Sequence, residues 1–314
     1  MHTNSISYPN LALFALLLFC LLQTSTLQAQ TPVDAIMMKQ GEICLAAVYE
    51  HSWFDHYWEG DYLRTNGTIA TVHRTAYSPM IAIGLFDRLN LLAGAPYVQT
   101  RSSEPNGGKF QGAKGFQDLS LALKGLLIDK DIDAAKLQLL TTVGFSTPIS
   151  NYLSDYRPYS IGFGAPEYSF RGILQYRQNS GFYTRIAGAY LLRGQTEAER
   201  DYYYNNGSYY TAWMDVPNAW EVRAVAGMWL LEDSFKAELA YQGLRSTSGD
   251  DVRPYNAAQP TNKVHFDQLN LMLQYYLPKP TGLGVLAYYG YTLNGRNTGK
   301  ASVIGAGLTY LFSL

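Results

Sequence analysis

Apolar and polar residues alternate in segment after segment of this chain, from about residue 42 to its C-terminus. In the range 264–277, for example, Leu269 and Leu271 occupy odd positions, whereas Gln268 and Asn270 occupy even ones. Side chains of one parity share a face of a β-strand, so each segment has one apolar and one polar side. The repeated pattern predicts an all-β protein, a transmembrane antiparallel up-and-down β-barrel of about twelve strands.

The expected strands are separated by connections that are alternately short and long. The short ones contain Asp, Asn, Ser, Pro or Gly, the residues that favour turns. Bacterial barrels combine short periplasmic turns, long external loops and an even number of strands, which predicts periplasmic termini and the outer membrane of a Gram-negative cell. The expected strand ranges are 42–54, 68–85, 88–100, 116–128, 134–147, 166–177, 181–195, 218–231, 234–246, 264–277, 282–293 and 301–312.

The chain begins with an apolar stretch, Leu11–Leu22, that is too short to span a bilayer but suits the core of a secretory signal peptide. We therefore expect residues 1–29 to be a signal peptide that is cleaved after about Ala29. Residues 30–41 would form a periplasmic N-terminal segment, either a plug in the lumen or a disordered stretch. Residues 42–314 would form the transmembrane β-barrel.

The composition limits the partners. Charged residues make up 16% of the chain and the net charge is −1, which gives no indication of a nucleic-acid partner. The expected partners are membrane lipid, the barrel-insertion machinery, which would recognise the final strand, and a small-molecule solute. Aromatic residues make up 14%, and those near strand ends suit the girdles at the membrane interfaces. We assign Trp53, Tyr97, Trp220 and Tyr276 to these girdles.

Charged and amide side chains of the inward parity are the candidate functional residues. A charge on the lipid face near the midplane costs about 2–4 kcal/mol, which favours placing these side chains in the lumen. They could line a polar pathway for solutes or form an ion-pair network that fills a narrow barrel, and the two arrangements can coexist. The lumen-lining candidates are Glu167, Arg171, Arg177, Arg185, Arg193, Glu221, Arg223, Lys236, Glu238, Gln242, Gln268, Asn270 and Gln274.

Two stretches carry a resemblance to a known family. Residues 84–91 read GLFDRLNL and are followed by the sequence PYV at 96–98, while residues 115–124 read GFQDLSLALK. These blocks resemble the outer-membrane proteins grouped as the MetA-pathway of phenol degradation family. The chain departs from the family pattern at Gln117, where Gly is usual, and at Gly125, where an aromatic residue is usual. The resemblance implies a barrel that passes small hydrophobic or aromatic compounds and brings no catalytic residues with it.

We therefore expect a passive or gated channel or transporter for small hydrophobic or aromatic compounds. One alternative is a plugged structural or surface-binding barrel that acts through its external loops, such as the tyrosine-rich loop 202–210. Another is a porin for acidic oligosaccharides, which would need a continuous ladder of Arg and Lys. No enzyme is expected, because His51 and Ser52 are neighbours on one strand and point to opposite faces. No cofactor or metal site is expected.

Overall fold

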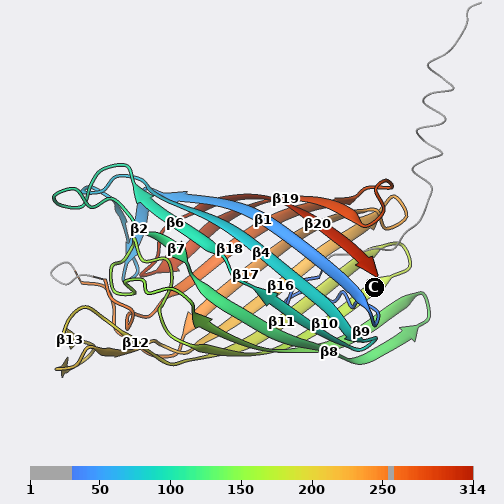
Figure 1. Ribbon diagram of the computed structural model, residues 1–314, viewed down its shortest axis with the longest axis horizontal. Helices are drawn as coiled ribbons and strands as arrows, with labels where there is room; N and C mark the ends of the chain where they lie inside the picture. The colour runs from blue at the N-terminus through green and yellow to red at the C-terminus, as the bar shows by residue number, and fades with distance from the viewer. Residues whose placement is uncertain (1–29, 254–257, 314) are drawn as a thin grey trace, which may run out of the picture.

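The structure, a computed structural model, describes residues 30–253 and 258–313. The predicted signal peptide, residues 1–29, lies outside the described residues. The described chain forms a closed antiparallel barrel whose strands are strongly tilted to its axis (Figure 1). β1 pairs with both β20 and β4, and this double pairing closes the sheet into a ring. The predicted fold class is confirmed.

Twelve strands form the wall, and the third and fourth of them are each interrupted once. Their bounds are β1 Glu42–Phe54, β4 Val72–Phe86, β5 Leu89–Gly94 with β6 Tyr97–Ser102, β7 Lys114–Phe116 with β8 Asp118–Ile132, β9 Ala135–Pro148, β10 Glu167–Gln178, β11 Phe182–Arg193, β16 Ala219–Leu230, β17 Phe235–Ser246, β18 His265–Tyr276, β19 Leu283–Arg296 and β20 Ser302–Ser313.

The interruption of the third strand has a local chemical cause. Pro96 has no N–H group to donate to a neighbouring strand, so the ladder stops between β5 and β6. Its carbonyl still accepts a hydrogen bond from the backbone N–H of Gln117, at 2.9 Å. Gln117 is the residue between β7 and β8, so the two interruptions lie side by side in the wall.

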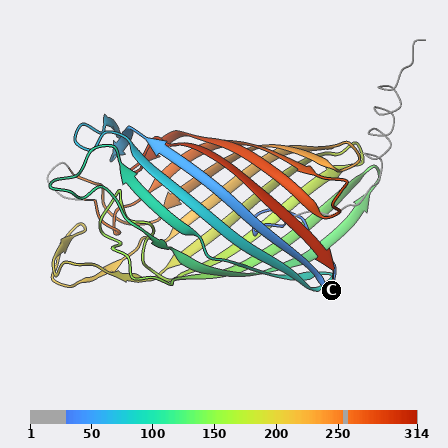
Figure 2. The ribbon, with the colours of Figure 1, turned by 45° about the horizontal axis from the view of Figure 1, so that its top comes forward.

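Short turns and long loops lie at opposite ends of the barrel (Figures 1 and 2). We call these the turn end and the loop end. Asp133 and Gly181 adopt positive φ angles of 50° and 90° in two of the turns, a backbone conformation that Gly and Asp tolerate. At the loop end the connections carry extra hairpins, whose strands are β2 His56–Glu59 with β3 Tyr62–Thr65, β12 Gln195–Glu197 with β15 Trp213–Asp215, and β13 Tyr203–Tyr204 with β14 Ser208–Tyr209.

The outer surface of the wall carries an aromatic row near the loop end. Tyr49 pairs in register with Tyr77, Tyr77 with Tyr97, and Tyr97 with Phe116. The rings of Tyr49 and Tyr77 lie 5.4 Å apart, as do those of Tyr97 and Phe116. A row of this kind, around an apolar exterior, matches the interfacial girdles of membrane barrels.

One of the residues assigned to the girdles lies elsewhere. Tyr276 is buried inside the barrel, where its ring stacks on Trp229 at 6.1 Å. Tyr276 has the same parity as Gln274, whose side chain also points inward. The alternation along the strand therefore sets the direction of Tyr276, although the residue lies near a strand end. Trp220, by contrast, is exposed on the outer surface as expected. Among the described residues, no helix is long and apolar enough to cross a membrane.

Candidate functional site

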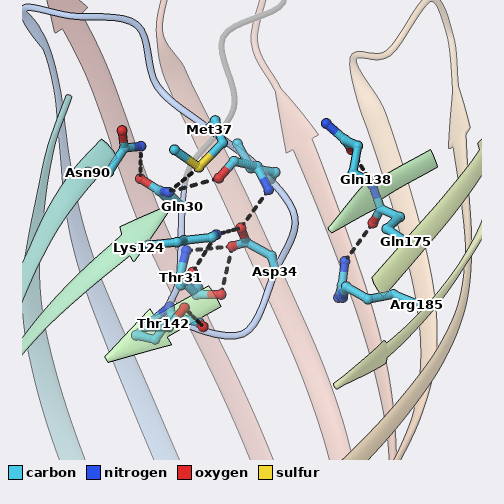
Figure 3. A network of polar contacts seen from close by, with 12 residues as sticks. Gln30, Thr31, Asp34, Met37, Asn90, Lys124, Gln138, Thr142, Gln175 and Arg185 are labelled. Carbon is cyan, nitrogen blue, oxygen red and sulfur yellow. Dashed lines mark hydrogen bonds and ion pairs between the residues drawn. The ribbon is translucent and has the colours of Figure 1, made fainter. Parts of the chain in front are cut away.

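The N-terminal segment, residues 30–41, lies inside the barrel at the turn end (Figures 1 and 2). Its central contact is an ion pair between Asp34 Oδ1 and Lys124 Nζ, which are 2.6 Å apart (Figure 3). Both side chains are almost completely buried, at 6% and 0% exposure. Lys124 Nζ also donates to the carbonyl of Thr31 at 3.0 Å. A cation from the wall thus fixes a carboxylate of the segment within the lumen.

Further polar contacts hold the segment on either side of this pair. Thr142 donates its hydroxyl to the carbonyl of Pro32 at 3.1 Å, and the amide groups of Gln30 and Asn90 are hydrogen-bonded (Figure 3). Near the wall the segment passes very close to Gly84. A Cβ atom built on Gly84 would lie 1.9 Å from the carbonyl oxygen of Lys39, so only glycine leaves room for the backbone there.

Apolar side chains of the same segment fill two parts of the lumen. Met38 packs in a cluster that includes Cys44, Leu92 and Trp229. Ala35 packs in a second cluster with Leu140 and other inward residues of the wall. Burial of apolar surface therefore adds to the ion pair in holding residues 30–41 in place.

A ladder of ion pairs crosses the lumen beside the segment. From the loop end to the turn end, each pair joins a predicted arginine to a carboxylate. The pairs are Arg193 with Glu167 at 2.7 Å, Arg171 with Glu221 at 2.9 Å, Arg185 with Glu238 at 3.0 Å and Arg177 with Asp233 at 2.6 Å. The arginine charges are thus balanced one by one. A continuous cationic ladder, which the porin for acidic oligosaccharides would require, is not formed by these residues.

Glu238 is the most connected carboxylate of this ladder. Besides Arg185, it accepts a hydrogen bond from the Tyr183 hydroxyl at 2.6 Å and lies 3.9 Å from Lys236 Nζ. All the charged groups here are buried, with side-chain exposures of 3% to 5%. Buried charges are stable only when paired and hydrogen-bonded, so each member of this cluster depends on the others.

Small residues in the intervening strands let these long side chains meet. Tyr183 pairs in register with Gly227, which pairs with Glu238, so the tyrosine ring crosses over the glycine to reach the carboxylate. A Cβ on Gly227 would lie 2.3 Å from that ring. The same arrangement recurs where Tyr288 crosses Gly305 to reach Glu50, at 2.7 Å.

The other predicted lumen residues also occupy the inner face. Gln242 donates to Glu221 at 3.3 Å, and Arg223 lies on the same stretch of wall between Glu221 and Val225. The carboxamide of Gln268 and that of Asn270 lie over Gly290, and Gln274 is buried at the turn end. Their participation in solute passage stays a prediction.

Three cavities lie along the lumen, and their volumes fall from the loop end inward. They measure about 820, 280 and 130 Å3. Phe163 and Gln117 line both the largest and the middle cavity, while Glu167 lines both the middle and the smallest. The smallest is lined by Pro32 of the N-terminal segment. The cavities therefore form a tapering series that starts among the loops and ends at residues 30–41.

Residues that the alternation could not reveal complete the site. Asp34, Arg157 and Phe163 lie outside the strands, where no period of two exists. Tyr183 does follow the inward parity of Arg185, and this signal could have identified it.

The histidines of β1 and β4 lie outside the lumen. His51 and His73 approach each other at 3.4 Å on the outer face of the barrel, whereas Ser52 has the opposite parity. Among the described residues, no three His, Cys, Asp or Glu side chains are grouped to hold a metal ion.

Comparisons with known proteins support the architecture. The chain is similar in structure to the COG4313 outer membrane channel from Pseudomonas putida F1, with a TM-score of 0.70 and 12% identity, over 90% of this chain and 100% of that one. The fold is that of an outer-membrane β-barrel. The translocator domain of autotransporter NalP from Neisseria meningitidis (TM-score 0.44, 13% identity, 88% and 90% covered) and the NanC porin (0.44, 10%, 84% and 98%) are too distant to support an argument. No family model and no curated protein sequence matches the chain.

Proposed function

We propose that the protein is a gated channel of the Gram-negative outer membrane for small hydrophobic or aromatic solutes. The observation that carries the proposal is the tapering series of cavities that ends at the N-terminal segment. With short turns in the periplasm, the loop end faces outward, and a solute would meet the largest cavity first. Residues 30–41 would then close the periplasmic side as a plug.

Aromatic side chains around the outer cavity support the solute class. Phe54, Tyr57, Trp58 and Phe163 line it, and their ring faces suit flat apolar molecules. The volume lies within the range of about 300–1,000 Å3 that is usual for small-molecule sites. The resemblance to the phenol-degradation family points in the same direction.

Single-channel recording tests this proposal. We expect the purified protein in planar bilayers to conduct ions, and catechol on the loop side to interrupt the current in a concentration-dependent manner. Inositol, a non-aromatic ring of similar size, should interrupt it far less. Absence of conductance, or equal interruption by the two solutes, would contradict the proposal.

A second candidate is a plugged barrel that works through its loops. The ion pairs and the docked segment favour it, because both occupy the lumen toward the turn end. The tyrosine-rich loop forms a hairpin in which the rings of Tyr203 and Tyr209 stack at 5.0 Å, while Tyr210 is 84% exposed. A permanently closed lumen with surface-binding loops would show no conductance under any condition.

The arginines provide a second measurement that separates these candidates. Replacing Arg171 and Arg185 by Ala removes the nearest cation from Glu221 and from Glu238, so the lumen becomes more negative. We expect the ratio of chloride to potassium permeability, measured from reversal potentials in a salt gradient, to fall several-fold.

The matched control is Arg245→Ala, because Arg245 lies on the outer face of β17, where it pairs with Asp267. This change should leave selectivity unaltered. Unchanged conductance and selectivity in the double variant would favour the plugged barrel.

A further inference from the structure

The loop between β9 and β10, residues 149–166, folds over the loop end of the lumen and is firmly anchored. Tyr159 and Ile161 are buried, with 0% and 2% exposure. The carbonyl of Tyr159 accepts a hydrogen bond from the Thr100 hydroxyl at 2.5 Å, and its own hydroxyl lies 2.8 Å from Ser102 Oγ. The side chains that this loop presents to the outer cavity are therefore held in defined positions.

Two guanidinium groups flank the ring of Phe163 on this loop. The Cζ atom of Arg157 lies 4.3 Å from the ring centroid and that of Arg193 lies 4.6 Å from it. Both distances are typical of cation–π contacts. Arg193 also forms an ion pair with Glu167, whereas Arg157 has no carboxylate partner among the described residues.

Arg157 differs in this respect from other arginines around the outer cavity. Arg64 pairs with Glu59 at 2.5 Å and Arg74 pairs with Glu50 at 3.3 Å. Burial, together with the charge of Arg193, lowers the pKa of Arg157 to about 10, so its side chain is cationic at neutral pH. The cavity thus presents a fixed positive charge beside an aromatic ring, without a counter-charge from the described chain.

We propose that Arg157 and Phe163 form a binding site for small aromatic carboxylates at the outer mouth of the lumen. The guanidinium group would bind the carboxylate through two parallel N–H···O hydrogen bonds, because the two planar groups have matching geometry. The ligand ring would lie in the cavity among Phe54, Tyr57 and Trp58. This inference rests on the proposed function and narrows its substrate class from aromatic compounds to aromatic anions.

Calorimetric titration of the full-length protein in detergent tests the site. Three probes separate the contributions of charge and ring. Benzoate carries a carboxylate and an aromatic ring, cyclohexanecarboxylate carries only the carboxylate, and benzyl alcohol carries only the aromatic ring. We expect benzoate to bind more tightly than the other two. Arg157→Gln should weaken benzoate binding by about tenfold to a hundredfold, the loss of one charge-assisted hydrogen-bonding group.

Arg245→Gln is the matched control, because Arg245 lies on the outer face of β17, where it pairs with Asp267 and does not line this cavity. It should change benzoate affinity by less than about threefold. Tyr57→Leu should reduce the preference for benzoate over cyclohexanecarboxylate, because the ligand ring would lie beside Tyr57. Heat-modified mobility in gel electrophoresis verifies that each variant retains a folded barrel.

Equal affinity of wild-type protein and Arg157→Gln for benzoate would overturn the inference, as would equal binding of benzoate and cyclohexanecarboxylate. Lack of benzoate binding by the wild-type protein would overturn it too. The channel proposal is tested separately by the conductance of the wild-type protein and its interruption by catechol, which carries no carboxylate. Wild-type protein that conducts and responds to catechol, but does not bind benzoate, would overturn only the site for aromatic anions.

Discussion

Replacement of Lys124 by methionine is expected to release the N-terminal segment and open the turn end of the lumen. The substitution keeps most of the side-chain volume but leaves Asp34 buried without its cation. Removing one partner of a buried ion pair costs about 3–5 kcal/mol. A change of about 3 kcal/mol raises the ratio of undocked to docked segment more than about a hundredfold. Single-channel recordings should show longer openings in this variant than in wild-type protein.

Lys136→Met is the matched control for this variant. Lys136 lies on the neighbouring strand β9 at the same end, and its ion pair with Asp129 is partly exposed to solvent, at 42% and 24%. Exposed pairs contribute about 0–1 kcal/mol, so this variant should behave like wild-type protein. In the double variant Lys124→Met, Asp34→Leu, an apolar pair replaces the buried charges, and closure should return. Unchanged gating in Lys124→Met would show that residues 30–41 do not control the lumen.

Replacement of Glu238 by glutamine is expected to give the largest loss of barrel stability. The change leaves the buried cations of Arg185 and Lys236 without their shared anion and weakens the hydrogen bond from Tyr183. We expect a loss of about 3–5 kcal/mol in the free energy of unfolding. Urea titration of the protein in detergent, followed by tryptophan fluorescence, measures this loss.

Asp233→Asn provides the comparison. Asp233 pairs with Arg177, but both side chains are nearly one-third exposed, and asparagine tolerates the positive φ of 66° at this position. Its loss should be less than about 1 kcal/mol. Similar losses in the two variants would show that burial does not govern the strength of these pairs.

The inner face of the barrel could be predicted from the sequence because a strand has a strict period of two. Charged residues such as Glu238 cannot face lipid cheaply, so their parity alone assigns them to the lumen. At Tyr276 the preference of aromatic residues for strand ends gave the wrong prediction, because this residue shares the inward parity of Gln274. The expected strand bounds agree with the structure to within a few residues, apart from the interruptions at Pro96 and Gln117.

The partners of these side chains could not be predicted, because they depend on the tilt and register of the strands. Arg171 reaches Glu221 across β11, where Ala189 pairs in register with both. No local pattern reveals such a row. Asp34 and Arg157 lie in segments without periodicity. The sequence therefore left residues 30–41 as either a plug or a disordered stretch, and it gave no sign of the flanked aromatic ring.

The inner cavities and the most buried ion pairs lie on different parts of the barrel wall. The two inner cavities are lined mainly by β5, β8, β9 and β10, whereas the most buried ion pairs join β10 and β11 to β16 and β17. One half of the circumference would therefore provide the path for solutes, and the other half would keep the barrel rigid. Amino-acid changes that alter transport should cluster in the first half, and those that lower stability should cluster in the second.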